Sequence, residues 1–280
     1  MQKHLLVTIS DEVSSMYAVR FLNSFLSHKE NIKLTLLYVA PSMGKDPGFA
    51  DREPTENECE LQEHSALQNA SYQLAQSGFK MENTECKYRK KAVSTATDIL
   101  REAEEGRYDA IVLGRRGTSR LEEILGSSVS MQVLEKRRSA PIWVCRNPES
   151  GGEDVLLCLD GSESSLRMAD HVGFMLEGES HSVTLFHVQK SESDRTEEIM
   201  SRARGALQGN NVDTSRIKEK VASGSNVVKA IMNEAQQGDY AVVAVGYSGT
   251  GKQGLMNQLT LGSASQKLCH NLQDRSLWIS

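Results

Sequence analysis

The amino-acid sequence contains two similar copies, and this internal repeat constrains the fold more than any other feature. The segment HLLVTISDEVSSMYAVRF (4–21) corresponds to DVLLCLDGSESSLRMADH (154–171), and each contains an apolar strand, a polar turn with paired serines and the start of a helix. Further along, KLTLLYV (33–39) corresponds to SVTLFHV (182–188). Because such self-similarity marks a duplicated structural unit, both copies are expected to adopt one fold.

The correspondence continues to the last strand of each copy. YDAIVLGRRG (108–117) matches YAVVAVGYSG (240–249), and APIWVC (140–145) matches RSLWIS (275–280). Four landmarks therefore occur in the same order in both copies. This agreement makes a duplication far better supported than a chance similarity.

The two copies differ in length and are joined by a linker. The first copy carries APSMGKDPGFADREPTE (40–56), whose prolines and glycines predict an extended surface loop. A segment rich in Pro, Gly and Ser lies between the copies. The sequence therefore predicts a first domain over 1–146, a linker over 147–153 and a second domain over 154–280.

Within each copy, short runs rich in Val, Ile and Leu alternate with amphipathic stretches. In the first copy, strands are predicted near 4–9, 33–39, 82–88, 110–114 and 141–145, and helices near 14–27, 57–77, 94–105 and 127–137. Such alternation is typical of β-α-β units, in which helices cover both faces of a parallel sheet. The runs AIVLG and AVVAVG are apolar throughout, so they are expected in the middle of the sheet. Each ends in glycine, and ligands of open α/β sheets bind at the carboxyl ends of central strands.

The last strand of each copy is expected to pair with its duplicate. PIWVC and SLWIS are apolar, and an exposed edge strand of this kind needs covering. The two copies are therefore expected to pack as an internal pseudo-dimer through their fifth strands. Trp143 and Trp278 lie on these strands and are interpreted as core or interface packing rather than as ligand contacts.

Composition excludes several classes of partner. The net charge of −5 and the pI near 5.9 provide no basic surplus for binding nucleic acid. The five cysteines show no C-x-x-C spacing, and the histidines show no H-E-x-x-H motif, so reduced thiols and no metal site are expected. No apolar run approaches the ~20 residues that span a bilayer. A cytoplasmic protein without nucleic-acid or membrane partners is expected.

Glycines flank a loop after the fourth strand of each copy. Gly114 and Gly117 precede Gly126-Ser127-Ser128, and Gly246 and Gly249 precede Gly262-Ser263. Such loops bring main-chain N–H groups close to an anion, and the following helix start adds further donors, so the pattern predicts a phosphate cradle. The alternative is that these residues only end a strand and cap a helix. The segment GYSGTGKQG also approaches a P-loop, but Gln253 stands where the motif needs Ser or Thr to hold Mg²⁺.

Together these segments resemble the universal stress protein family in its tandem form. The resemblance rests on LCLDGSESS (157–165), LFHV (185–188), GRRG (114–117) and the Gly-Ser pairs at 126–127 and 262–263, and it covers nearly the whole chain. It implies two tandem five-stranded parallel-sheet α/β sandwiches with strand order 3-2-1-4-5, of the adenine nucleotide alpha-hydrolase-like type. Members of this family either bind ATP or do not.

The resemblance also implies which residues would hold ATP, with the presence of Mg²⁺ left open. In the second copy, the aspartate would meet the adenosine, the valine would line the base, and the glycine and serine elements would hold ribose and phosphates: Asp160, Val188, Gly246, Gly249, Gly262 and Ser263. The corresponding residues of the first copy are Val39, Gly114, Gly117 and Ser128. An adenine nucleotide is the expected partner, together with the chain itself as a pseudo-dimer; a homodimer is left open.

The two copies depart from the family pattern in different parts. Ser10 stands where the second copy has Asp160, and the second copy has a longer glycine loop through Thr250–Gln253. The second copy is ranked as the better site because it keeps the carboxylate and both glycine elements. Arg115 and Arg116 are expected either to pair with phosphate or to point to solvent.

The expected function is nucleotide binding with a regulatory or protective role in stress. No general base or metal-binding carboxylate pair is evident, so at most slow ATP hydrolysis is expected and the chain is not assigned as an enzyme. The alternative is a structural or interaction stress protein that has lost nucleotide binding and acts through its dimer surfaces. Three features favour that alternative: Ser10, the glycine spacings that differ from the family pattern, and the loop 40–56. His187, near the end of the second strand, is interpreted as a packed and hydrogen-bonded histidine.

Overall fold

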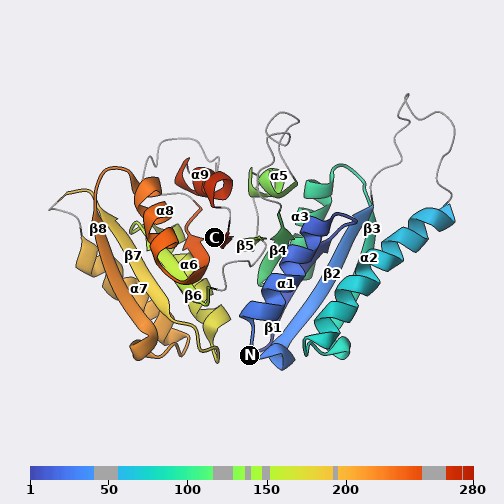
Figure 1. Ribbon diagram of the computed structural model, residues 1–280, viewed down its shortest axis with the longest axis horizontal. Helices are drawn as coiled ribbons and strands as arrows, with labels where there is room; N and C mark the ends of the chain where they lie inside the picture. The colour runs from blue at the N-terminus through green and yellow to red at the C-terminus, as the bar shows by residue number, and fades with distance from the viewer. Residues whose placement is uncertain are drawn as a thin grey trace.

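Ten strands form one continuous sheet in the computed structural model of the protein (Figure 1). The structure describes residues 1–40, 56–115, 129–135, 140–146, 152–191, 195–247, 263–272 and 274–280. The strand order is β3-β2-β1-β4-β5-β10-β9-β6-β7-β8. The part of the chain that carries β1 to β5 is called the first half, and the part that carries β6 to β10 the second half. The strands within each half are parallel and follow the order 3-2-1-4-5, which confirms the predicted topology.

The apolar runs of the sequence form the strands. Those of the first half are β1 (Lys3–Ile9), β2 (Ile32–Ala40), β3 (Thr84–Lys90), β4 (Ala110–Gly114) and β5 (Ile142–Cys145). Those of the second half are β6 (Asp154–Leu159), β7 (Val183–Gln189), β8 (Ile217–Ser223), β9 (Tyr240–Val245) and β10 (Ser276–Ile279). The unbroken apolar runs become β4 and β9, which lie between two neighbours as predicted.

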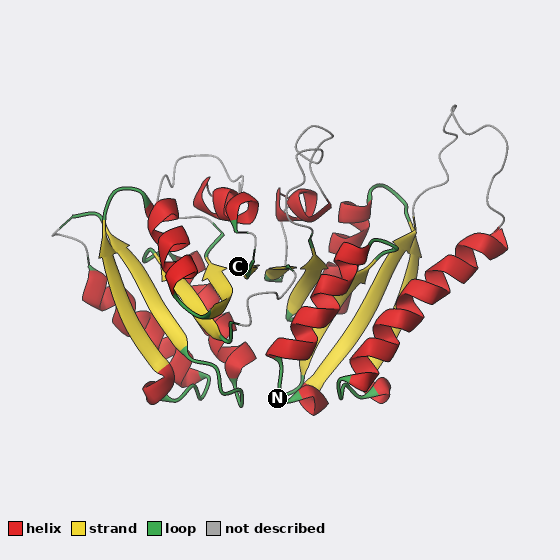
Figure 2. Ribbon diagram, in the orientation of Figure 1, coloured by secondary structure: helices red, strands yellow, loops and turns green. Residues whose placement is uncertain are grey.

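Helices cover both faces of the sheet (Figure 2). They are α1 (Met16–Phe25), α2 (Glu56–Gln76), α3 (Thr95–Gly106), α5 (Val129–Glu135), α6 (Glu163–Leu176), α7 (Thr196–Gly209), α8 (Val227–Gln237) and α9 (Ser263–Asn271). Short 3-10 turns occupy Val13–Ser15, Lys29–Asn31, Met81–Asn83 and Thr214–Arg216. Alternate residues of a strand face opposite sides, so Leu5 and Val7 pack in the core under α1 and α2, whereas Leu6 packs under α3 and α5. The buried side chains thus form one apolar layer on each face.

The two halves are joined where the last strand of one meets the last strand of the other. β5 and β10 pair antiparallel, and Trp278 lies opposite Trp143 in the register. The two indole rings are stacked with centroids 3.9 Å apart and planes only 5° from parallel, and both side chains are fully buried. The predicted pseudo-dimer through the fifth strands is therefore confirmed, and each apolar edge is covered by its duplicate.

The two tryptophans occupy equivalent positions but differ in the hydrogen bonding of their indole N–H groups. Trp143 Nε1 donates a hydrogen bond of 3.0 Å to His171 Nε2. Burial lowers the pKa of His171 to about 3, so its imidazole is neutral at physiological pH and can accept this bond. The residue that corresponds to His171 in the first half is Phe21, whose ring meets Trp143 and Trp278 edge to face, with centroids 6.2 and 6.4 Å apart, and cannot accept a hydrogen bond. Within the described residues, Trp278 Nε1 has no hydrogen-bond partner. The junction is therefore symmetric in backbone pairing but not in side-chain chemistry.

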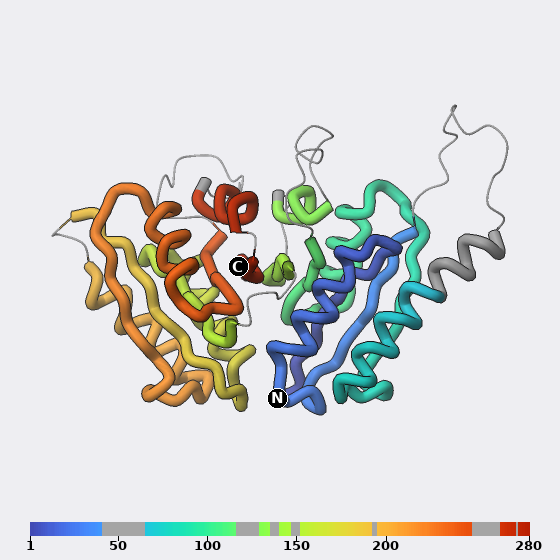
Figure 3. The backbone as a smooth tube through the Cα atoms, in the orientation of Figure 1, coloured from blue at the N-terminus to red at the C-terminus, as the bar shows by residue number. Residues whose placement is uncertain are grey.

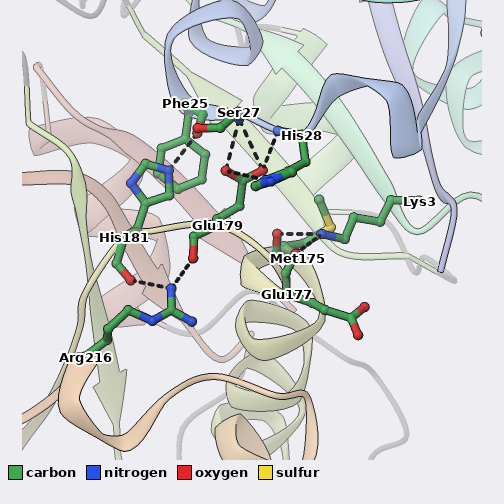
Figure 4. Close-up of polar contacts among 9 residues, drawn as sticks. All are labelled: Lys3, Phe25, Ser27, His28, Met175, Glu177, Glu179, His181 and Arg216. Carbon is green, nitrogen blue, oxygen red and sulfur yellow. Dashed lines mark hydrogen bonds and ion pairs between the residues drawn. The ribbon is translucent and has the colours of Figure 1, made fainter.

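A buried carboxylate of the second half binds the end of a helix in the first half (Figure 4). Glu179, whose side chain is 1% exposed, accepts hydrogen bonds from the backbone N–H groups of Ser27 (3.0 and 3.2 Å) and His28 (3.3 Å), just after α1. Two residues on, His181 stacks on the ring of Phe25 and donates from Nε2 to the Phe25 carbonyl at 2.7 Å. The segment before β7 is thereby fixed against the C-terminal end of α1.

A buried lysine makes the reverse connection. Lys3 in β1 is 4% exposed and donates from Nζ to the carbonyls of Met175 (3.0 Å) and Glu177 (3.1 Å) at the C-terminal end of α6 (Figure 4). The last carbonyls of a helix have no partner within it and carry its negative dipole end, so a cation suits this position. Burial lowers the pKa of Lys3, and nearby carboxylates including Glu179 oppose this effect. The N-terminal strand of one half thus caps a helix of the other, near the N-terminus shown in Figure 3.

Each half also contains a buried glutamate that links a helix to the outermost strand. Glu102 in α3 accepts from Lys87 (2.9 Å) and Arg89 (2.7 Å) of β3 and from the Tyr108 hydroxyl (2.8 Å). In the second half, Glu234 of α8 accepts from the Tyr240 hydroxyl at 2.9 Å. It also forms an ion pair with Lys220 of β8, as Glu102 does with Lys87 of β3. Burial acts to raise the pKa of Glu102, but the hydrogen bonds from Lys87, Tyr108 and Arg89 outweigh it, so the pKa lies below its ordinary value of 4.5.

Two sequence predictions fall on parts of the chain that the structure does not describe. Residues 41–55 of the extended loop and residues 147–151 of the linker lie outside the described residues. Within the described residues, the helices are too short or too polar to cross a membrane.

Glu179→Ala is expected to destabilise the protein by about 2 kcal/mol, because it removes the buried carboxylate that accepts from the N–H groups of Ser27 and His28. Urea unfolding followed by circular dichroism measures this loss. Glu177→Ala is the matched control, since the Glu177 side chain is 35% exposed and its contacts are surface contacts worth about 1 kcal/mol or less. Equal losses in the two variants would contradict the role assigned to Glu179.

The stabilisation from Glu102 is expected to disappear in acid. The folded state lowers the pKa of Glu102, so its contribution is present above the ordinary pKa of 4.5 and is lost as pH falls through the lowered value. Glu102→Gln should therefore cost about 2 kcal/mol at pH 7, and its deficit against wild type should shrink as pH falls below 4.5. The exposed Glu104→Gln on the same helix should show no such pattern. A pH-independent deficit for Glu102→Gln would count against the hydrogen-bonded carboxylate.

Candidate functional site

One cavity lies at the carboxyl ends of the second half's strands. It has a volume of about 570 Å³, and three of the predicted residues line it together: Asp160 after β6, Val188 near the end of β7 and Gly246 after β9. Cavities of roughly 300–1,000 Å³ are the usual size for small-molecule sites. The position matches the rule that open α/β sheets bind ligands beyond the carboxyl ends of their strands.

The turn after β6 holds the Asp160 carboxylate in a fixed place. Asp160 Oδ1 accepts from the backbone N–H of Ser162 (3.0 Å) and from its hydroxyl (2.6 Å). Ser162 is the N-cap of α6 and accepts from the N–H of Ser165 at 3.2 Å. Gly161 adopts φ +79°, a conformation that side-chain-bearing residues avoid. The turn therefore sets a carboxylate at the cavity wall through hydrogen bonds that do not involve a ligand.

The rest of the cavity wall is partly apolar and partly cationic. The apolar residues are Cys158, Leu159, Phe186, Val188, Val227, Val228, Ile231, Val245, Ala264 and Leu268. Lys190 after β7 and Lys267 on α9 supply positive charge, and Asn226, the N-cap of α8, accepts from the N–H of Lys229 at 3.0 Å. Asp160 is the one carboxylate among the described lining residues. Such a wall can pack against a flat apolar ring, accept from hydroxyls and attract an anion.

Sequence reasoning did not find most of these lining residues. Cys158 and Phe186 lie in strands whose ends were identified, so the alternation along each strand could have found them. Lys267 lies on α9 beyond the predicted Gly262-Ser263 pair, and Asn226 is the N-cap of α8, so neither residue belongs to a recognised motif. Their presence in the cavity depends on how α8 and α9 pack on the sheet. This packing cannot be predicted from the local sequence.

The glycines after β4 and β9 are required by close helix packing. A Cβ on Gly246 would lie 2.7 Å from both Ser164 Oγ and Ser165 N, and a Cβ on Gly114 would lie 2.1 Å from the Ser14 carbonyl. These distances are too short for non-bonded atoms, so only glycine lets the helix after the first strand approach so closely. Both glycines thus have a packing role that was not predicted from the sequence, and Gly246 lines the cavity as well.

The equivalent position in the first half is built differently. Ser10 accepts from the N–H of Glu12 at 3.3 Å, and a 3-10 turn follows directly in place of the Asp-Gly turn. Tyr38, at the position of His187, donates from its hydroxyl to Asp11 Oδ2 at 2.5 Å. Val39 is half-buried beside it. The first half therefore replaces the aspartate of the turn with a tyrosine–aspartate contact.

Several predicted site residues lie outside the described residues. Gly117, Ser128, Gly249 and Gly262 are in this group, as are Arg116 and the Thr250–Gln253 segment. Ser263 is the first residue of α9, which agrees with the prediction that a helix begins there. The phosphate part of the predicted site therefore stays a prediction.

The expectation that Arg115 points to solvent was wrong, whereas its pairing with phosphate stays a prediction. The side chain neither points to solvent nor lines the described cavity, since it is 6% exposed and donates from Nη1 to Cys269 Sγ of the second half at 2.7 Å. The sequence placed Arg115 in a local loop, whereas its contact is made across the junction of the two halves. His187, by contrast, is buried and donates from Nδ1 to the Leu159 carbonyl at 2.8 Å, which confirms a packed, hydrogen-bonded role.

The fold defines a doubly wound α/β protein with a cavity at its strand ends. The model of the universal stress protein family matches residues 1–146, and the chain belongs to that family. The second half repeats the same strand order. Within the described residues, no group of three or more His, Cys, Asp or Glu side chains is placed to hold a metal ion.

Solved structures share this fold over nearly the whole chain. A universal stress protein from Archaeoglobus fulgidus DSM 4304 superposes with a TM-score of 0.71 and 18% identity, covering 99% of this chain and 97% of that one. A functionally unknown protein from Pseudomonas aeruginosa PAO1 gives 0.60 and 15%, and a putative universal stress protein from Pseudomonas aeruginosa UCBPP-PA14 gives 0.58 and 15%; each alignment covers 99% of this chain and 92% of that one. Comparison with curated proteins found no match. At these identities the likeness shows the fold.

Gly246→Ala is expected to destabilise the protein by about 1–3 kcal/mol, because its Cβ would collide with the first turn of α6. Thermal and urea unfolding measure the loss. Gly205→Ala in α7 is the matched control: a Cβ there meets nothing within 4 Å, and the change should stabilise the helix by up to about 1 kcal/mol. Equal stability of Gly246→Ala and wild type would contradict the packing argument.

Proposed function

We propose that the protein binds an adenine nucleotide, ATP first of all, in the cleft of the second half. The observation that carries the proposal is that Asp160, Val188 and Gly246, which the family resemblance assigns to adenosine, base and phosphate loop, line one cavity of about 570 Å³. These residues are far apart in the sequence, and the sheet brings them to one edge.

The lining residues suit the three parts of a nucleotide. The Asp160 carboxylate is an acceptor for ribose hydroxyls, and Val188 and Phe186 supply apolar surface for a flat base. Lys190 and Lys267 can pair with phosphates. The first turn of α9 has N–H groups without helical partners, which favour an anion.

The cleft favours binding over turnover. Among the described lining residues, Asp160 is the one carboxylate, it is engaged with Ser162, and no histidine lines the cavity. A general base aimed at a bound phosphate is thus missing from these residues. Binding in the service of a regulatory or protective stress role follows, with at most slow hydrolysis.

The second candidate is a stress protein that acts through its surfaces without a nucleotide. The contact between Tyr38 and Asp11 favours it for the first half, where it occupies the place of the nucleotide turn. For the second half the open cavity favours binding. β5 and β10 pair with each other within the chain, so these two edges are not open for pairing between two protein molecules.

ATP at one hundred times its Kd is expected to raise the free energy of unfolding by about 2.7 kcal/mol, measured by thermal shift with and without Mg²⁺. Asp160→Asn should weaken binding about tenfold, because it removes the charge while its side-chain oxygen can still accept from Ser162. Val228→Trp should abolish the shift by filling the cavity. Ser10→Ala in the first half is the control and should keep the full shift.

Two results would overturn the proposal. One is the absence of any ATP-dependent shift in the wild-type chain. The other is a full shift in both Asp160→Asn and Val228→Trp, which would move the nucleotide out of this cleft.

A further inference from the structure

In each half, the residue that follows the glycine at the end of the fourth strand contacts the other half. Arg115, directly after Gly114, donates from Nη1 to Cys269 Sγ in α9 at 2.7 Å. Tyr247, directly after Gly246, donates from its hydroxyl to the Leu134 carbonyl in α5 at 3.3 Å. The two residues occupy corresponding positions of the repeat. Arg115 and Tyr247 thus each contact a helix of the other half, α9 and α5 respectively. Both helices lie at the junction in Figure 1.

Arg115 holds the C-terminal part of α9 from the first half. Its backbone N–H donates to the Cys145 carbonyl at 2.8 Å, which fixes it to the end of β5. Arg146, also from the first half, donates from Nη2 to the Cys269 carbonyl at 2.6 Å. Two guanidinium groups therefore meet the negative end of the α9 dipole. Burial raises the pKa of the Cys269 thiol, and the nearby arginines oppose this effect.

The opposite side of α9 forms part of the nucleotide cleft. Ala264, Ser265, Lys267 and Leu268 line the cavity, whereas Cys269 does not. Ser265 Oγ donates to the Gly246 carbonyl at 2.9 Å, which ties the first turn of the helix to the end of β9. α9 is thus held at its first turn by the second half and near its last turn by the first half.

We propose that Arg115 is a positioning residue for the nucleotide cleft of the second half, although it belongs to the first half. It fixes α9 through Cys269, and α9 presents Lys267 and its own first turn to the ligand. Tyr247 is the reciprocal contact, so the two halves set each other's last helix. This inference rests on nucleotide binding in the second-half cleft.

The chemistry of a buried arginine allows the binding role to be separated from stability. Arg115 is 6% exposed and, within the described residues, its side-chain partner is a thiol rather than a carboxylate. Taking a guanidinium out of water is costly, and the Arg115 Nε has no hydrogen-bond partner within the described residues, so an apolar side chain of similar volume removes a desolvation cost that offsets the lost contact. Arg115→Met should therefore remain folded while releasing α9.

The test is ATP titration by calorimetry, combined with hydrogen exchange of the nucleotide-free full-length chain. Arg115→Met is expected to weaken ATP binding about tenfold, equivalent to about 1.4 kcal/mol, and to speed amide exchange in α9 but not in α6. Arg115→Lys, which keeps a cation that can reach Cys269, should restore affinity to within about threefold of wild type. Arg101→Met, an exposed arginine on α3, is the matched control and should bind as wild type does. Cys269→Ala should weaken binding, and its combination with Arg115→Met should be no weaker than Arg115→Met alone.

The outcomes separate this inference from the proposed function. If wild type binds ATP and Arg115→Met binds it equally well, the positioning role is overturned while the cleft stands. An equal loss in Arg115→Met and Arg115→Lys without faster exchange in α9 would also overturn it. If wild type does not bind ATP, the proposed function fails, and this inference fails with it.

Discussion

The structure depends on the antiparallel pairing of β5 with β10. Without it, each half would end in an apolar strand with unpaired N–H and C=O groups and an exposed tryptophan. The pairing turns two five-stranded sheets into one, and the stacked rings of Trp143 and Trp278 fill the space above the pair. The edges that remain are β3 and β8, which carry exposed charged residues such as Glu85 and Lys218. Charged edges of this kind resist further sheet pairing, so the sheet ends where it is.

A duplication joined in this way permits the two copies to specialise. The second half keeps the Asp-Gly turn and an open cavity, whereas the first half has Ser10 and the bond between Tyr38 and Asp11. At the junction, His171 accepts a hydrogen bond from Trp143, whereas Phe21, at the matched position, only packs against the two tryptophans. Differences at matched positions are physically informative, because backbone and topology are the same. They fit the proposal that the second half binds the nucleotide and the first half supports it.

The strands and the joining edge were predicted from apolar periodicity and from the repeat, whereas the strand order was predicted from the resemblance to universal stress proteins. The sequence also identified Asp160, Val188 and Gly246, which lie at strand ends that the topology brings together. It did not predict the contact of Glu179 with the end of α1 or the path of Arg115 to α9. These contacts depend on the distance across the β5–β10 junction, and neither partner has a local pattern that marks the other. The phosphate loop stays a prediction, since Gly249 and Gly262 lie outside the described residues.

The number of nucleotides bound per chain tests the account most directly. Native mass spectrometry of the full-length protein, titrated with ATP, reports this number without relying on any variant. One ATP per chain is the expected result, because the second half keeps the Asp-Gly turn beside a cavity, whereas the first half has Ser10 and the bond between Tyr38 and Asp11 at the corresponding place. Two bound nucleotides per chain, or none at any concentration tested, would contradict it.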